Sequence, residues 1–124
     1  MNNPEVTMHE HQQTKRFDAL EKATRAAGIS ISLVMRVPNA LRPIADQIIR
    51  SASSVAANLA EGSGRSGRDQ LHYWRIAHGS AKEIDTHLKL LIGTVAVDRL
   101  RAAEALQLSD DVRTMTWRLL HPTP

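Results

Sequence analysis

The sequence has no cysteine, few aromatic residues and no long apolar run. Without cysteine the chain cannot form disulfides, thiolate metal sites or a cysteine nucleophile, and this fits a reducing compartment. No segment approaches the roughly 20 apolar residues that span a bilayer, and the first residues lack the apolar stretch of a signal peptide. We therefore expect a cytoplasmic protein with no membrane partner.

The residues that are present favour helices. Aromatic residues make up 3% of the 124-residue chain, whereas alanine and leucine are abundant, a mixture typical of helices rather than sheets. This length is enough for one domain with its own core. The formal net charge of +3 does not predict a dense positive field. We expect a single all-α domain.

Four segments repeat apolar residues at the three- and four-residue steps of a helix. The first has the inward positions Phe17, Leu20, Ala27, Ile31 and Val34. The second, from about 41 to 62, has Leu41, Ile44, Ile48, Ala52, Val55 and Leu59. The third has Trp74, Ala77, Ala81, Ile84, Leu88, Leu91 and Val95. The last, from near Asp98 to before Pro122, has Ala105, Leu108, Val112, Met115 and Leu119.

Short connections between these segments predict an antiparallel up-down four-helix bundle over residues 14–121. Residues 1–13 are polar and show no apolar period, so we expect a disordered tail there. Ile29, Ile31 and Leu33 also alternate with serines as in a strand. A helix is preferred, because a lone strand in a helical chain has no partner.

The loop Gly62–Gly67 reads GSGRSG and matches the dinucleotide-binding pattern G-x-G-x-x-G. That pattern binds nucleotides where a strand precedes it and a helix follows it inside a βαβ unit. Here a helix precedes it and no parallel sheet is expected, so an interhelical turn is the better interpretation. Ser66, followed by Asp69 three residues later, resembles the capping start of the next helix.

The histidines and serines do not follow the sequence motifs of catalytic or metal-binding sites. His72, His78, His87 and His121 form no i, i+4 pair and no H-E-x-x-H motif, and no serine lies in a nucleophile elbow. We therefore expect a protein that is not an enzyme and that holds no metal or other cofactor.

The second segment carries a polar stripe that consists mostly of small side chains: Gln47, Ser51, Ser54, Asn58, Glu61 and Arg65. The side chains on a solvent-exposed helix face are usually longer and more often charged. The stripe therefore favours close contact with another helix, within the bundle or across an oligomer, although solvent exposure is an equal alternative.

Arginines outnumber acidic residues by two between residues 42 and 75. They are Arg42, Arg50, Arg65, Arg68 and Arg75. Acids four residues before a base, as in Asp46–Arg50 and Asp85–Lys89, neutralise part of this charge. Arg65, Arg68 and Arg75 escape such pairing best, and they are the leading candidates for nucleic-acid contact. Tyr73 beside Trp74 offers a stacking surface, although its spacing predicts that Trp74 is core.

Two blocks of sequence resemble a known family. They are IRSASSVAANLAEG at 49–62, followed by Gly64-Arg65, and YWRIAHGSAKEI at 73–84. They are similar to the bacterial four-helix bundle proteins of large-subunit ribosomal RNA intervening sequences. The accessory protein of diversity-generating retroelements, which binds reverse transcriptase and nucleic acid, is a relative of that family.

The resemblance implies a homo-oligomeric ring of five bundles that associates with RNA or with a reverse-transcriptase-like partner. It also marks Asn58, Glu61, Gly62, Gly79 and Ser80 as motif residues. We expect structural roles for them: Asn58 and Glu61 could bond Ser80 or the loop backbone, and Gly79 could admit a close helix. The leading hypothesis is RNA binding by the arginines, and the alternative is a protein-interaction scaffold without nucleic-acid contact.

Overall fold

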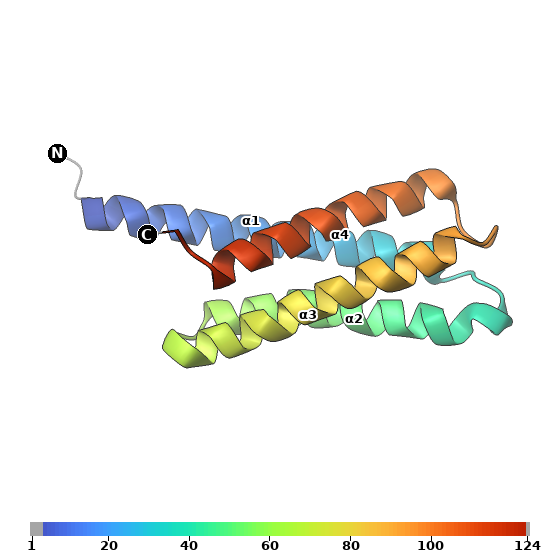
Figure 1. Ribbon diagram of the computed structural model, residues 1–124, viewed down its shortest axis with the longest axis horizontal. Helices are drawn as coiled ribbons and strands as arrows, with labels where there is room; N and C mark the ends of the chain where they lie inside the picture. Colours follow the sequence, from blue (N-terminus) through green and yellow to red (C-terminus); the bar gives the residue numbers. More distant parts are fainter. Residues whose placement is uncertain (1–3, 124) are drawn as a thin grey trace.

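The computed structural model describes the backbone of residues 4–123, and the side chains of residue 10 and of residues 13–123. Four long helices follow one another: α1 (Pro4–Val34), α2 (Arg42–Ser63), α3 (Gly67–Ile92) and α4 (Arg99–Leu120), with a 3-10 turn at Asn39–Leu41 before α2 (Figure 1). They run alternately up and down. The expected all-α four-helix up-down bundle is confirmed.

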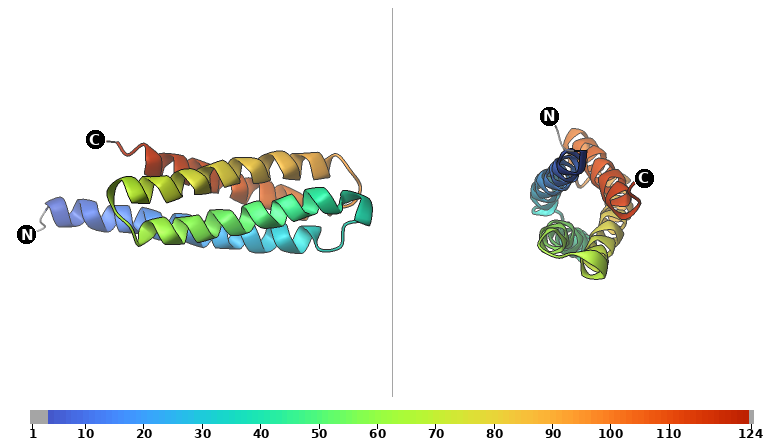
Figure 2. Two further views of the ribbon diagram at one scale, coloured as in Figure 1. Left: turned by 90° about the horizontal axis from the view of Figure 1, so that it is seen from below. Right: turned by 90° about the vertical axis from the view of Figure 1, so that its left-hand side faces the viewer.

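Each helix packs against two neighbours, so the bundle has four corners when it is viewed along its axis (Figure 2). Helices α1 and α3 each contact both α2 and α4. The beginning of α1, the α2–α3 loop and the end of α4 lie together at one end of the bundle. Functional residues in the α2–α3 loop and at the end of α4 therefore share this end.

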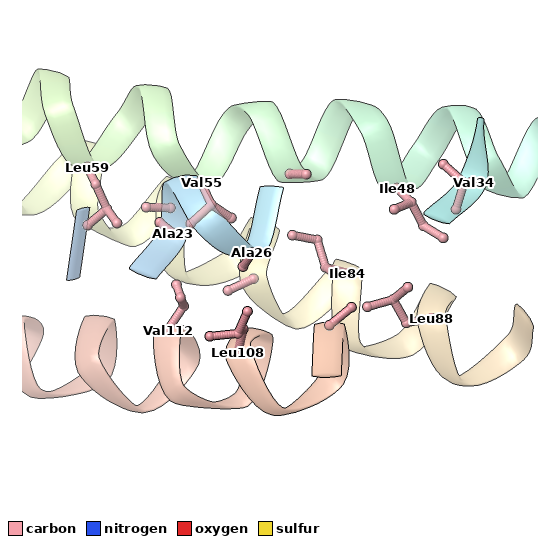
Figure 3. Packing of buried hydrophobic residues seen from close by; sticks show 14 of the residues in the cluster. Ala23, Ala26, Val34, Ile48, Val55, Leu59, Ile84, Leu88, Leu108 and Val112 are labelled. Carbon is pink, nitrogen blue, oxygen red and sulfur yellow. The ribbon is translucent and has the colours of Figure 1, made fainter. Parts of the chain in front are cut away.

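The core is a continuous line of apolar side chains along the bundle axis (Figure 3). Its largest fully buried aliphatic members are Ile48, Leu59, Leu88, Leu91, Val34 and Val112. In α3 the predicted stripe is buried from Trp74 to Leu91. Val95 was predicted wrongly as its last member, because α3 ends at Ile92 and Val95 lies exposed in the following loop.

Of the five expected inward positions of α1, Val34 is buried and the other four are not. The buried positions are Ala19, Ala23, Ala26, Ser30 and Val34. Phe17 is 66% exposed, while Leu20, Ala27 and Ile31 are half-buried at the edge of the core. The line of small side chains lets α1 lie close to its neighbours, whereas the larger Phe17 does not fit there.

Residues 4–13 are helical, so the expected disordered tail is wrong for this segment, and residues 1–3 lie outside the described residues. Polar residues such as Glu10, Gln13 and Lys15 are good helix formers even without an apolar period. The helix also continues through Ile29–Leu33, so the strand alternative is wrong. Pro4 stands in the first turn, where its missing N–H costs nothing.

Two helix starts differ in how they are capped. The carboxylate of Asp98 accepts hydrogen bonds from the backbone N–H groups of Leu100 and Arg101, at 2.9 and 3.1 Å, and so begins α4. Ser66 precedes α3 in an extended conformation but makes no side-chain capping bond. Ser66 therefore occupies the expected N-cap position but does not make the expected capping hydrogen bond.

Candidate nucleic-acid interface

The α2–α3 connection is built around Gly62 and Trp74. Trp74 is 3% exposed, and its ring lies against the backbone of Gly62. A β-carbon at position 62 would lie 2.6 Å from Cδ1 and 2.7 Å from Nε1 of the indole. Only glycine leaves space for Trp74 at this point, which gives the motif residue Gly62 a direct physical role.

Gln70 holds the loop from the α3 side. Its amide Nε2 donates to the carbonyl oxygens of Gly62 and Arg65, at 3.0 and 2.9 Å. The Gly62 carbonyl, near the end of α2, also accepts from the backbone N–H of Arg65 at 3.1 Å, so Gln70 adds a second bond there and ties the loop to α3. Gly67, the first residue of α3, has φ of +60°, a conformation that glycine adopts without strain. The glycines thus shape an interhelical turn, and nothing in its geometry resembles a βαβ nucleotide loop.

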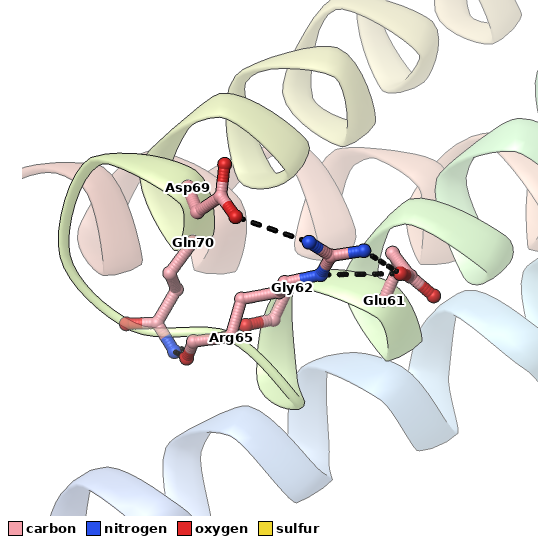
Figure 4. Close-up of polar contacts among 5 residues, drawn as sticks. All are labelled: Glu61, Gly62, Arg65, Asp69 and Gln70. Atoms are coloured by element: carbon pink, nitrogen blue, oxygen red, sulfur yellow. Dashed lines mark hydrogen bonds and ion pairs between the residues drawn. The ribbon is translucent and has the colours of Figure 1, made fainter.

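Arg65 is the most heavily paired arginine of the candidate set, contrary to expectation (Figure 4). Its guanidinium donates to Glu61 at 2.7 Å and to Asp69 at 3.0 Å, and it lies 5.1 Å from the centre of the Tyr73 ring. The hydrogen bonds to Glu61 and then to Asp69 raise the pKa of Arg65. Its charge is neutralised locally, so Arg65 is a poor candidate for phosphate contact.

Arg42 and Arg50 lie away from the loop. The side chain of Arg42 donates to Asp46 at 3.2 Å and to the backbone carbonyl of Val34 at 3.4 Å, at the opposite end of α2. Because Asp46 pairs with Arg42, the expected Asp46–Arg50 pair does not form. Arg50 lines an open polar depression between α2 and α3. The five candidate arginines therefore do not converge on one site.

Arg68 and Arg75 do lie together, on the outer side of α3. They are seven residues apart, which is two helical turns and about 10 Å along the axis. The exposed residues on this side of the helix follow a 4-3-4-3 spacing and include no acid; we call them the α3 basic face: Arg68, His72, Arg75, Gly79 and Lys82. Sequence reasoning missed Lys82, although its distance of seven residues from Arg75 was visible.

The acidic residues of α3 are engaged on other sides of the helix. Asp69 pairs with Arg65, the carboxylate of Glu83 accepts a hydrogen bond from Ser51 on α2, and Asp85 pairs with Lys89 at 2.9 Å. Within the described part of the chain, Arg68, Arg75 and Lys82 have no ion pair. Their charges are therefore available to an external anion.

Helix α4 adds a second group of side chains beside this face. The imidazole Nδ1 of His78 and the hydroxyl of Thr116 share a hydrogen bond of 2.8 Å across α3 and α4. Burial lowers the pKa of His78, and the nearby charges of Lys82, Arg113 and His121 lower it further. Lys82 of α3 and Arg113 of α4 are therefore close enough to His78 to act on its charge.

Trp117 is the exposed aromatic residue at this contact, and sequence reasoning did not select it. Its side chain is 51% exposed, and its ring stacks on His121 with 4.3 Å between ring centres. By contrast, the guanidinium of Arg65 lies over Tyr73, and Trp74 is buried. The expected stacking surface at residues 73 and 74 is thus largely covered, and Trp117 offers the open ring.

The polar stripe of α2 divides between the bundle and solvent. Ser51 bonds Glu83, and the hydroxyls of Ser54 and Ser80 lie 2.8 Å apart, so both serines join α2 to α3. Asn58 donates to the backbone carbonyl and the hydroxyl of Ser54, and reaches Ser80 only through that serine. Gln47, at the other end of the stripe, is exposed.

Glu61 and Gly79 do not act as expected. Glu61 bonds the side chain of Arg65 rather than the loop backbone, which Gln70 holds. A β-carbon at Gly79 would meet no atom within 4 Å, so no helix of this bundle approaches closely there. Gly79 instead leaves the backbone of α3 uncovered in the middle of the α3 basic face.

Two other kinds of site can be assessed on the described residues. No group of three His, Asp or Glu side chains among them is arranged to hold a metal ion. None of the described helices has an apolar stretch of the length and purity that crossing a membrane requires.

The family model described as "23S rRNA-intervening sequence protein" matches residues 15–118, which include all of α2 and α3 and most of α1 and α4. The chain belongs to this family. The match extends well beyond the two blocks at 49–84 that first indicated it. Among curated proteins, none matches the chain.

A solved structure supports the fold of this intervening-sequence protein. It is a protein of unknown function from the S23 ribosomal protein family of Bacteroides thetaiotaomicron, with a TM-score of 0.76 and 24% sequence identity. The similarity covers 86% of this chain and 97% of that one. At this level of identity the likeness shows a shared four-helix bundle and no activity.

Proposed function

We propose that this protein is a non-enzymatic, cytoplasmic RNA-binding protein that contacts phosphates through the α3 basic face. The observation that carries the proposal is the exposure of Arg68, Arg75 and Lys82 on one side of one helix, with none of the described carboxylates paired to them. Unpaired cations aligned on a rigid helix attract the phosphate backbone and release its counterions.

Two further observations support this function. Gly79 lies between Arg75 and Lys82 and carries no side chain, so a phosphate backbone can approach the helix closely at that point. The description of the family also refers to ribosomal RNA intervening sequences. Arg65 and Arg42 have no part in the proposal, because Glu61, Asp69 and Asp46 neutralise them.

We also propose that the protein forms a homo-oligomer, a ring of five copies as the family resemblance implies. Phe17 and Met35 are 66% and 65% exposed. Phe17 lies in α1, and Met35 directly follows its last residue, Val34. Large exposed apolar side chains at both positions are what a surface covered by another copy would present.

The oligomer is tested by light scattering. The double substitution Phe17→Ser and Met35→Ser should reduce the molar mass to that of the monomer, while circular dichroism stays helical. The control is Val95→Ser with Leu100→Ser, which changes two exposed apolar residues near the α3–α4 loop and should leave the mass unchanged. A monomeric unmodified protein would overturn the proposal.

RNA binding is tested by titrating labelled RNA at several salt concentrations. Affinity should fall steeply with salt. The double substitution Arg68→Glu and Arg75→Glu should reduce the magnitude of the slope of log K against log salt by about 1.4, because each phosphate contact with a single strand contributes about 0.7. A matched control is Arg99→Glu with Arg101→Glu, two exposed arginines in the first turn of α4, which should bind as the unmodified protein does.

Absence of binding at low salt would overturn the proposed function. Equal loss of affinity in the control variant would show that general charge, rather than the α3 basic face, attracts the RNA. Capture of a protein partner by a variant that no longer binds RNA would favour the scaffold alternative instead.

A further inference from the structure

The end of α4 places an open aromatic ring next to cationic side chains. Trp117 is half exposed, and His121 covers one part of its ring by stacking at an interplanar angle of 21°. Both residues lie in the last turn and C-cap of α4. Covering the exposed part of this indole would be favourable, because it would remove apolar surface from water.

The end of α4 adjoins the helix that carries the α3 basic face. Thr116, which precedes Trp117, bonds His78 on α3, and His78 is three residues from Arg75 and four from Lys82. Arg113 is four residues before Trp117, one turn along α4. Arg113 is paired with Asp110, whereas Arg118, which follows Trp117, is exposed and has no ion pair among the described residues. The unpaired cations of the neighbouring helix are those of the α3 basic face.

A ring beside a row of unpaired cations fits one ligand chemistry. Phosphates of a nucleic-acid strand match Arg75 and Lys82, and an unpaired base matches the indole face. A base in a duplex is already stacked and cannot lie against a side chain, whereas a single strand can turn its bases outward.

We propose that the protein binds single-stranded nucleic acid, with a base stacked on Trp117 and the neighbouring phosphates on Arg75 and Lys82. This inference rests on the proposed function, and it adds the strandedness of the ligand and the residue that selects it. Trp117 is the selecting residue because the basic face alone would bind single and double strands alike.

The chain contains two tryptophans, and Trp74 is buried and shielded from a ligand, so a change in tryptophan fluorescence on binding reports on Trp117, with Trp117→Ala giving the signal of Trp74 alone. The probes are a single-stranded RNA, the single-stranded DNA of the same sequence and the RNA duplex. Both single strands should quench the fluorescence, and the duplex should leave it nearly unchanged. Quenching by RNA alone would show that the 2′-hydroxyl is also read and would narrow the ligand to RNA.

The decisive variant is Trp117→Ala. It should lower the affinity for single strands by about 5- to 150-fold, the range expected for one stacked base, while affinity for the duplex stays the same. Trp117→Phe should recover part of the loss because it keeps a ring. Leu100→Ala, which removes an exposed apolar side chain at the start of α4, is the control and should not change the ratio of the two affinities.

The two proposals fail in different ways. If no probe binds at low salt, both fail. If single strands and duplex bind equally, with steep salt dependence and no quenching, the α3 basic face binds nucleic acid but the stacking role of Trp117 is wrong. If none of the three probes changes the fluorescence but a protein does, the exposed indole belongs to a protein-binding surface.

Discussion

The indole of Trp74 occupies the space that a side chain at position 62 would need. A β-carbon added to Gly62 would lie 2.6 Å from Cδ1 of that ring, a distance that real β-carbons do not tolerate. Trp74 is also where α3 enters the core, and the guanidinium of Arg16 lies 5.2 Å from the ring centre on the α1 side. The meeting of α2 and α3 at the loop therefore depends on this one glycine.

Gly62→Ala should lower the free energy of unfolding by about 1–3 kcal/mol, the usual cost of overpacking a well-filled site. This loss exceeds the gain of about 0.5–1 kcal/mol that alanine brings to a helix. Chemical denaturation measures it. The control is Gly79→Ala, where nothing lies within 4 Å and only the helix gain applies, so stability should rise. A neutral or stabilising Gly62→Ala would contradict the packing described.

The serines between α2 and α3 should act as a coupled pair. Ser54 and Ser80 share a hydrogen bond of 2.8 Å, and Asn58 donates to Ser54 as well. Ser54→Ala should cost about 1 kcal/mol of stability, because it leaves the Ser80 hydroxyl without its partner, whereas Asn58 keeps its bond to the carbonyl of residue 54. In a double-mutant cycle, adding Ser80→Ala should cost much less than it does alone. Strict additivity would mean that the two hydroxyls do not interact in solution.

Asp98 should contribute a measurable share of the stability of α4. Its carboxylate accepts from two backbone N–H groups that have no partner within the helix. Asp98→Ala should lower the free energy of unfolding by about 1 kcal/mol, whereas Asp98→Asn, which keeps an accepting oxygen, should cost only a few tenths. Equal losses for the two variants would show that the hydrogen bonds are not the cause.

His78 should make stability depend on pH in a defined direction. Burial, followed by the charge of Lys82, lowers its pKa below the ordinary value of 6.5. Between the lowered pKa and 6.5 the unfolded chain therefore binds more protons at this site than the folded chain does. The free energy of unfolding should be highest above that window, fall as pH decreases through it and then level off.

Denaturation curves at a series of pH values check this dependence. His78→Gln should flatten the fall in stability within the window. His72→Gln, which changes an exposed histidine on the same helix, should keep the fall seen in the unmodified protein. If His78→Gln shows the same pH profile as the unmodified protein, another group is responsible.

Periodicity alone determined the helical class, the number of helices and the inward stripe of α3. A helix that is buried along one side must repeat its apolar residues every three or four positions, and α3 does so without interruption from Trp74 to Leu91. Charge spacing also placed Arg68 and Arg75 on one face. These properties depend on residues close together in the chain, so local reasoning reaches them.

Contacts between helices decided the rest. Gly79 looked like a packing residue until no neighbour was found near it. The pairing of Arg65 was instead visible in the spacing, because Glu61 lies four residues before it and Asp69 four residues after it. In α1 the fit of small alanines against two neighbours, rather than hydrophobicity, selected the buried side and left Phe17 exposed. The bond between His78 and Thr116 brings the residue before Trp117 onto α3. No spacing within one helix contains that information, because it arises only when two helices meet.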